Sequence, residues 1–343
     1  MHIEQVRKIA DAVLYEGYLL YPYRRSAIKN RQRWTIGVVY PRAYSEASAN
    51  SNNPWSMQTE CLLTGQPDDL SLTIQSRFLH LLQRTDMQPT TPVLAQFDAL
   101  RASAWSLADR LAYEPYEEGI EREISIPDVS LSDLLAHPRV VVITFPGQRV
   151  VEKDLIREQH PISGAIRLSA EAIDESVFKL RVQIENTTPE TGTLINQQNA
   201  VLLQAFISTH TIVRVQGGAF ISLLEPPKVL QMAAQACHNL HTWPILMGEI
   251  GDTDLVLSSP IILYDYPQIA PESPGALFDG TEIDEILILR ILTLTEDEKQ
   301  QMREGDERTR EMLRRTEALT SEQLMQLHGT IRSMQPVDEG ECI

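Results

Sequence analysis

The sequence contains few cysteines, and they are not spaced for a metal or redox motif. Cys61, Cys237 and Cys342 are the three cysteines among 343 residues, and no two of them form a C-x-x-C pair. An odd number of distant cysteines argues against a disulfide framework and against a zinc site built from cysteines alone. We therefore predict a protein of a reducing compartment, the cytoplasm.

Motifs that mark common enzyme classes are also missing. The chain has no P-loop, no G-x-S-x-G, no H-E-x-x-H and no G-x-G-x-x-G that follows a strand. No stretch approaches the roughly 18 uninterrupted apolar residues of a membrane-spanning helix. The first residues, Met1 to Glu4, resemble the start of an amphipathic helix more than a signal peptide. These absences favour a non-catalytic protein without a membrane span, although they do not exclude an enzyme.

Positive charge is scarce and unevenly placed. The net charge is −17, yet residues 1–40 hold seven Lys or Arg against three acids, a local charge of 7 − 3 = +4. The remaining residues therefore carry −17 − 4 = −21. Because nucleic-acid binding depends on clustered cations that contact phosphates, this balance disfavours a nucleic-acid partner.

The apolar pattern predicts an α+β protein with a β-rich centre. Residues 3–15 have apolar side chains at helical spacing, which predicts a short N-terminal helix. Residues 177–185 alternate strictly and would direct Val177, Leu180, Val182 and Ile184 into a core. Several short strands separated by turns over residues 120–225 indicate a sandwich or a strongly bent sheet.

Other segments are predicted with less distinct patterns. Residues 34–40 and 140–145 are expected to be buried strands, whereas 70–82 fits a strand or a helix. Helices are expected at 95–113 and 226–240, and a further strand at 258–266.

The C-terminal part is expected to be helical. A helix is predicted from 281 into the 290s, and Thr295 to Glu298 forms a capping box that would open a charged helix to about residue 316. A second box, Thr320 to Gln323, would open a helix to about 333. We accordingly divide the chain into an N-terminal mixed segment (1–115), a β-rich central domain (116–294) and a C-terminal helical segment with a polar tail (295–343).

One cluster resembles a metal site. Cys237, His238 and His241 lie close together in sequence, and thiolate and imidazole are good ligands for zinc, nickel or copper. The three positions do not share one helical face, and no second cluster nearby supplies further ligands. The alternative is a buried cysteine with two ordinary histidines at a helix end.

An aromatic and basic run is the first candidate for partner binding. Its residues are Tyr21, Tyr23, Arg24, Arg25, Lys29, Arg31, Arg33 and Trp34. Interleaved rings and cations suit a protein interface, and they also suit single-stranded nucleic acid. A third interpretation is structural, with the arginines paired to acids of this chain.

An acidic and aromatic loop is the second candidate. Residues 264–285 include Tyr264, Asp265, Tyr266 and Asp279 together with four further acids. Converging carboxylates could hold a hard cation or act as acid and base, but the spacing matches no calcium loop. An ordered acidic surface is the simpler expectation.

Two long segments carry a family resemblance. LYEGYLLYPYRRSAIKNRQRW at 14–34 and LSSPIILYDYPQIAPESPGALFDGTEIDEILILRILTLT at 257–295, continued at 315–329, resemble an uncharacterised bacterial family associated with nickel–iron hydrogenase gene clusters. The resemblance implies a setting and no catalytic residues. Together with the missing enzyme motifs and the two candidate surfaces, it indicates a non-catalytic accessory or scaffold protein whose partner is a hydrogenase subunit or maturation factor. The rival is a metal-dependent enzyme or metallochaperone that uses the Cys237 cluster and a transition metal.

Overall fold

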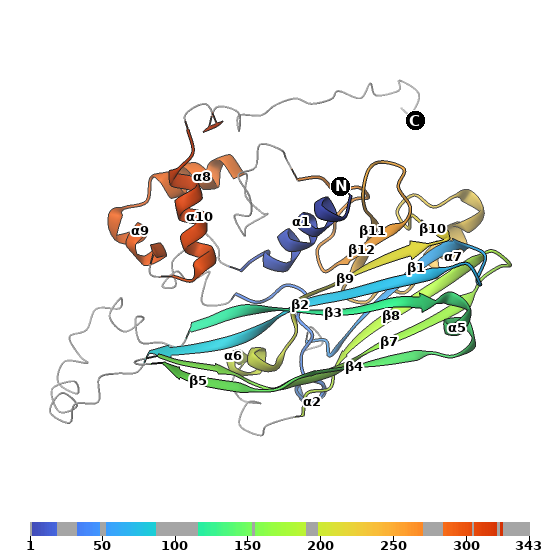
Figure 1. Cartoon of the computed structure of the whole chain (residues 1–343), viewed down its shortest axis with the longest axis horizontal. Helices are drawn as coiled ribbons and strands as arrows, with labels where there is room; N and C mark the ends of the chain where they lie inside the picture. The colour runs from blue at the N-terminus through green and yellow to red at the C-terminus, as the bar shows by residue number, and fades with distance from the viewer. Residues whose placement is uncertain are drawn as a thin grey trace.

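The computed structural model shows two antiparallel sheets with a helix before them and helices after them along the chain (Figure 1). It describes residues 2–18, 33–48, 53–86, 116–152, 155–189, 198–269, 284–303, 305–320 and 323–324. The predicted α+β architecture with a β-rich centre is thereby confirmed. The helix expected at 95–113 lies outside the described residues.

The first sheet has five strands in the order β10-β1-β8-β7-β4. Their bounds are β1 (Ser56–Gly65), β4 (Arg139–Phe145), β7 (Ile162–Ala172), β8 (Val177–Asn186) and β10 (Gly218–Ile221). Neighbouring strands are antiparallel throughout, with Val142 opposite Ala165 and Cys61 opposite Leu180.

The second sheet has seven strands and is organised around the long strand β2. Its members are β2 (Ser71–Asp86), β3 (Tyr116–Ser130), β5 (Gln148–Glu152), β6 (Leu155–Gln159), β9 (Ile207–Gln216), β11 (Trp243–Leu246) and β12 (Leu255–Ser259). One edge of β2 pairs with β3, and the other edge pairs first with β9 and then with β6. The ambiguous segment 70–82 is therefore a strand. The division at residue 115 stays a prediction, although each sheet combines strands from both sides of it.

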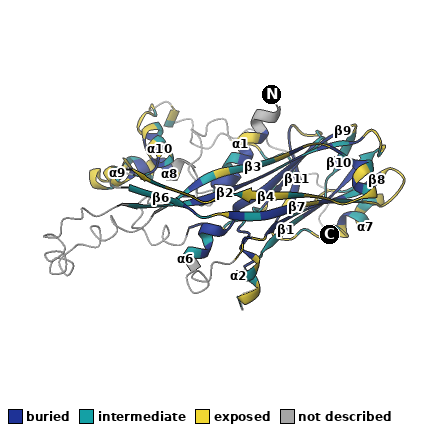
Figure 2. Ribbon diagram, turned by 60° about the horizontal axis from the view of Figure 1, so that its bottom comes forward, coloured by how far each residue is buried: buried dark blue, intermediate teal, exposed yellow. Residues whose placement is uncertain are grey.

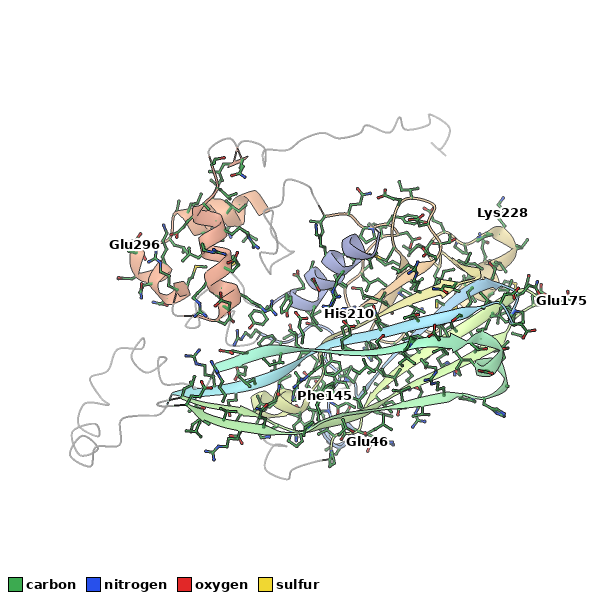
Figure 3. All side chains as sticks on the ribbon, in the orientation of Figure 1. Glu46, Phe145, Glu175, His210, Lys228 and Glu296 are labelled. Carbon is green, nitrogen blue, oxygen red and sulfur yellow. The ribbon has the colours of Figure 1, made fainter. Side chains whose placement is uncertain are left out.

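The main core lies between the two sheets (Figure 2). Leu180, Val182 and Ile184 are buried there as the alternation predicted, whereas Val177 is buried outside this core and Phe178 packs in it instead. Each such side chain contributes roughly 1.5–3 kcal/mol through removal from water. Aromatic rings close one end of this core: Phe78 stacks on Phe206 at 4.5 Å, and Phe145, labelled in Figure 3, meets Phe78 edge-on at 6.1 Å.

Two predicted buried strands differ from the expectation. Residues 34–40 are largely buried but form no regular strand, because Trp34 (φ 67°) and Gly37 (φ 54°) have left-handed backbone conformations. The segment joins the sheet through the Val39–Phe206 bridge and through the N–H groups of Ser208 and Thr209, which donate to the Ile36 and Gly37 carbonyls. Residues 140–145 do form a strand, but Val140 and Val142 are exposed because β4 lies at a sheet edge with its outer face uncovered.

Proline and local helices move the ends of other strands. The strand predicted at 258–266 is β12, which ends at Ser259 because Pro260 has no N–H to continue the ladder. Short helices occupy connections between strands. They are α2 (Arg42–Ala47), α5 (Leu131–Ala136), α6 (Gln198–Val201), η2 (Leu202–Gln204), η3 (Lys228–Leu230) and α7 (Gln231–Gln235).

Helix α1 (His2–Tyr15) packs on the outer face of the second sheet. Its buried residues Val6, Ile9 and Val13 contact Ile212 and Leu257. The helical spacing of apolar residues near the N-terminus is thus explained by one buried helix face. In the part of the chain that the structure describes, no helix has both the length and the apolar character needed to cross a bilayer.

A charged cluster fixes α1 to the sheet. The guanidinium of Arg77 on β2 is buried and lies 2.6 Å from Asp11 of α1, 3.5 Å from Glu121 and 3.7 Å from Glu123 of β3. Tyr15 donates a hydrogen bond to Glu121. Burial alone would raise the pKa of Glu121, but the Tyr15 bond and the nearby arginines lower it below its usual value.

Three further helices form the C-terminal segment: α8 (Asp284–Leu292), α9 (Glu296–Arg303) and α10 (Glu307–Glu317). Both predicted capping boxes are present, with Glu298 N–H donating to Thr295 Oγ1 at 3.3 Å and Gln323 N–H donating to Thr320 Oγ1 at 3.3 Å. The single helix expected over 295–316 is instead α9 and α10. Asp306 starts a new helix by accepting a hydrogen bond from Thr309 N–H at 2.8 Å.

Candidate protein-binding surface

Residues 222–242 leave the sandwich between β10 and β11, and we call this segment the arm. It contains η3 and α7. Figure 1 shows α7 at one end of the sandwich, away from α9, and Lys228 is labelled at that end in Figure 3. The arm includes the cluster of Cys237, His238 and His241 that the sequence singled out. Its two ends are each fixed by a carboxylate.

Asp265 holds the beginning of the arm. Its Oδ2 accepts a hydrogen bond from Ser222 Oγ at 2.6 Å, and its Oδ1 accepts one from the Leu246 N–H at 2.7 Å. Ser222 Oγ in turn accepts bonds from the N–H groups of Leu224 and Glu225 at 3.1 and 2.9 Å. Asp265 is therefore a structural link between the arm and β11 in this structure, and its oxygens already have partners.

Glu60 of β1 holds the end of the arm. Its carboxylate is fully buried and accepts hydrogen bonds from Arg181 Nε at 2.6 Å and from the His238 N–H at 2.7 Å. Asn239 spans the backbone of Glu60, with its Oδ1 2.7 Å from the Glu60 N and its Nδ2 3.2 Å from the Glu60 O. The Leu240 N–H donates to the Gln58 carbonyl at 2.9 Å, so this part of the arm extends the sheet beside β1.

These contacts explain why the helix predicted at 226–240 is shorter than expected. The described helical residues are 228–235, and the chain then changes direction so that residues 238–240 pair with β1. Backbone N–H groups that bond across to β1 are not available to a continuing helix. The sequence pattern contains no sign of this pairing, because the partner strand is far away along the chain.

The structure does not assemble the predicted metal site. Cys237 Sγ lies 3.6 Å from the Ala233 carbonyl, while His238 and His241 are exposed and His241 has a left-handed backbone (φ 62°). Among the residues that the structure describes, no three His, Cys, Asp or Glu side chains come together to hold a metal. The assignment of Cys237, His238 and His241 as metal ligands is therefore not supported, because the turn after α7 separates the side chains.

The thiols near the arm are poor nucleophiles. Burial raises the pKa of Cys237 to about 11, and burial together with the nearby Cys237 and Glu60 raises the pKa of Cys61 still further. We expect both thiols to react with Ellman's reagent at about pH 8 roughly a hundredfold more slowly in the folded than in the unfolded protein, since the thiolate is the reactive form. Stopped-flow absorbance on a Cys342→Ser variant would measure this. A fast reaction of folded Cys237 would contradict the expectation.

Two residues of the aromatic and basic run are interior. Arg33 and Trp34 are buried, and Arg33 donates to the Glu117 carbonyl at 2.6 Å while its guanidinium lies 4.7 Å from the centre of the Trp34 ring. Trp34 also meets Tyr18 edge-on at 5.0 Å. Arg33 and Trp34 therefore stabilise the core beneath the C-terminal helices. This agrees with a structural role for these two residues and not with a direct contact to a partner.

The other predicted contacts of that run lie outside the described residues. They are Tyr21, Tyr23, Arg24, Arg25, Lys29 and Arg31, and Asp279 of the acidic loop lies outside as well. Tyr266 is described and is structural, because its hydroxyl donates to the Asp252 carbonyl at 3.1 Å and its N–H donates to the Leu246 carbonyl at 2.8 Å. Tyr264, in contrast, is 86% exposed.

The arm presents apolar side chains that sequence reasoning missed. Val229 is 89% exposed and Met232 is 84% exposed. They are three residues apart across η3 and α7, so they project from the same side of the helical turn. Other exposed large apolar residues on the arm or in the strands and loop beside it are Leu224, Leu240, Trp243, Ile262 and Tyr264. Methionine, tyrosine and tryptophan are the residue types that protein interfaces favour.

Fold and surface together define an α+β protein built on two packed antiparallel sheets, with a rigidly attached apolar arm. No protein-family model, curated protein or solved structure matches the chain. The comparisons therefore name no relative.

Proposed function

We propose that this chain is a non-catalytic accessory or scaffold protein of the cytoplasm that binds another protein through the arm. The observation that supports this best is the exposure of Val229 and Met232 on a segment whose ends are fixed. Isolated exposed apolar residues are common on protein surfaces. Here they occur on a short, ordered helical turn that Glu60 and Asp265 hold in place, and a surface held in place loses little conformational freedom on binding.

The chemistry of the surface fits a protein partner better than a small polar ligand. Apolar side chains gain from burial against another apolar surface, and Met adapts its shape to the surface it contacts. The fixed carboxylates of Glu60 and Asp265 bind the arm itself, so they are not free to act on a substrate. This arrangement supports binding without supplying a catalytic group.

For the partner, we propose a nickel–iron hydrogenase subunit or a factor that matures it. This step depends on the resemblance of residues 14–34 and 257–295 to a family associated with hydrogenase gene clusters. Residue Tyr264, exposed next to the arm, lies in the second of these segments. The described beginning of this segment therefore lies beside the proposed surface, where Asp265 accepts a hydrogen bond from Ser222 of the arm.

A pull-down tests both parts of the proposal. The wild-type chain, tagged and expressed in cells that make the hydrogenase, should recover a hydrogenase subunit or maturation factor. A Val229→Glu/Met232→Glu double variant should recover about tenfold less or lower still, because each charge would have to be buried in the interface. The control is Val151→Glu, which places one of these charges on an exposed apolar position of β5, away from the arm.

The outcomes separate the two parts. If the wild type recovers no hydrogenase-related protein, the proposed partner is wrong. If it recovers one and the double variant recovers as much, the arm is not the binding surface. Equal loss with Val151→Glu would mean that added charge acts through general repulsion and not through the arm.

A further inference from the structure

Strand β4 is an open edge of the five-stranded sheet. It pairs with β7 on one side, from Arg139 opposite Leu168 to Phe145 opposite Ile162. On its other side, no described strand pairs with it. Figure 1 shows β4 along the lower margin of the sandwich. Backbone N–H and C=O groups at such an edge can accept another strand.

The other described edge strands carry features that block pairing, whereas β4 does not. Strands β10 and β11 have four residues each, and β11 contains Pro244. Strand β5 begins near Arg149 and ends with Glu152, and β3 is strongly charged and contains Pro127. Strand β4 has seven residues, RVVVITF, with a single charge at its first position and neither proline nor glycine. Short strands, charges and prolines are the means by which proteins protect sheet edges.

The outer face of β4 is apolar and unprotected. Val140 is 50% exposed and Val142 is 73% exposed, while Ile143 on the opposite face is buried in the main core. The strand is thus firmly held from inside and presents β-branched side chains to solvent. Exposed valines beside a free backbone edge combine the two requirements of strand addition, hydrogen bonding and apolar contact.

We propose that β4 is the interface of a symmetric dimer, in which β4 of a second copy pairs antiparallel to it. A two-fold axis normal to the sheet would place Val142, the middle residue of the strand, opposite Val142 of the other copy. Full overlap then sets Val140 opposite Thr144 and Arg139 opposite Phe145. The two five-stranded sheets become one continuous sheet of 5 + 5 = 10 strands.

The charges of the strand fit this pairing. In the proposed register the two Arg139 side chains lie six residues apart along the strand direction, which is about 20 Å at the usual rise per residue. That separation exceeds the screening length at physiological salt, so the like charges do not oppose pairing. Each Arg139 instead lies opposite the uncharged Phe145, so no like charges face each other across the two strands. The strand is therefore complementary to itself.

Sedimentation analysis tests the dimer. The wild type should change from a 38.8 kDa monomer to a dimer as its concentration is raised. Because each copy has a net charge of −17, added salt should strengthen the association. Val142→Lys should weaken the dimer by about tenfold or more, since two ammonium groups would meet at the axis. Val151→Lys on β5 is the matched control and should leave the dimer unchanged.

A cross-link tests the register independently of how Val142→Lys folds. In the proposed pairing the two Cβ atoms of residue 142 are about 4.5–5.5 Å apart. A Val142→Cys, Cys342→Ser variant should therefore form an intermolecular disulfide with oxidised glutathione. The two thiols lose two electrons and two protons, and the oxidant is reduced to two molecules of glutathione. Val151→Cys in the same background should stay monomeric on a non-reducing gel.

Several results would overturn the inference. A wild type that remains monomeric at every concentration rules out a second copy as the partner of β4. This holds even if Val142→Lys were found to weaken binding of a different protein. A dimer that Val142→Lys does not weaken, or that salt dissociates, rests on another surface. Absence of the Val142→Cys cross-link in a wild-type-like dimer refutes the register. None of these results depends on the arm, so the proposed function stands or fails separately.

Discussion

Lowering the pH from about 8 to about 5 is expected to destabilise the folded chain by about 4 kcal/mol through two buried histidines. His210 on β9 is fully buried, with its Nδ1 2.9 Å from the Ser208 carbonyl. His80 on β2 is also buried, with its Nε2 2.8 Å from the His160 carbonyl. Both rings are held neutral in the interior.

The pKa of each histidine is lowered for a physical reason. Burial, with a smaller contribution from Arg77, lowers the pKa of His210 to about 4, although the Ser208 bond and Glu121 act in the opposite direction. Burial and Arg122 likewise lower the pKa of His80 to about 4. A buried imidazolium next to a guanidinium would be both poorly solvated and repelled.

The direction of the pH effect follows from these values. Below the ordinary histidine pKa of 6.5, the unfolded chain binds protons that the folded chain does not bind until about pH 4. Stability from these two groups is therefore complete above pH 6.5, falls as the pH decreases toward 4, and changes little below it. At pH 5 the linkage amounts to about 2 kcal/mol for each ring.

Urea unfolding at the two pH values would measure this effect. A His210→Gln variant should lose about half of the pH dependence, because one of the two titrating rings is gone. His238→Gln is the matched control, since the ring of His238 is exposed, and it should keep the full dependence. Equal stability of the wild type at both pH values would show that the buried rings do not remain neutral in the folded state.

Local sequence patterns determined what could be predicted of the fold. Alternation placed Leu180, Val182 and Ile184 on one face of β8, and two capping boxes marked helix starts at Thr295 and Thr320. These signals depend on neighbours within a few residues, so they can be found without knowing the tertiary structure. They were sufficient for the fold class.

The candidate surface could not be predicted, because it depends on contacts between distant residues. Glu60 and His238 are 178 positions apart, and their hydrogen bond ends the helix that local propensity favours. The helix predicted at 226–240 did not indicate whether Val229 and Met232 are exposed, and only the tertiary structure shows that nothing described covers them. Conversely, Arg33 was a candidate for partner contact and is buried, because Glu117 and the Trp34 ring satisfy its guanidinium.

Replacing Glu60 by glutamine is expected to destabilise the protein by about 3 kcal/mol and to release the end of the arm. The carboxylate is fully buried and receives two donors, Arg181 Nε and the His238 N–H. A glutamine keeps the size of the side chain but would direct an N–H₂ group at one of these donors. The cost is moderated because the Arg181 side chain is partly exposed and can regain water.

Hydrogen exchange distinguishes loss of the arm from general loss of stability. In Glu60→Gln, the amides of His238 and Leu240 should exchange about tenfold faster or more relative to those of β8, because local opening no longer breaks a charged hydrogen bond. The matched control is Glu185→Gln on β8. Glu185 accepts two 2.9 Å bonds from Arg167 Nε on the same sheet and does not hold the arm. Protection of His238 and Leu240 that falls equally in both variants would mean that the arm unfolds only with the whole domain.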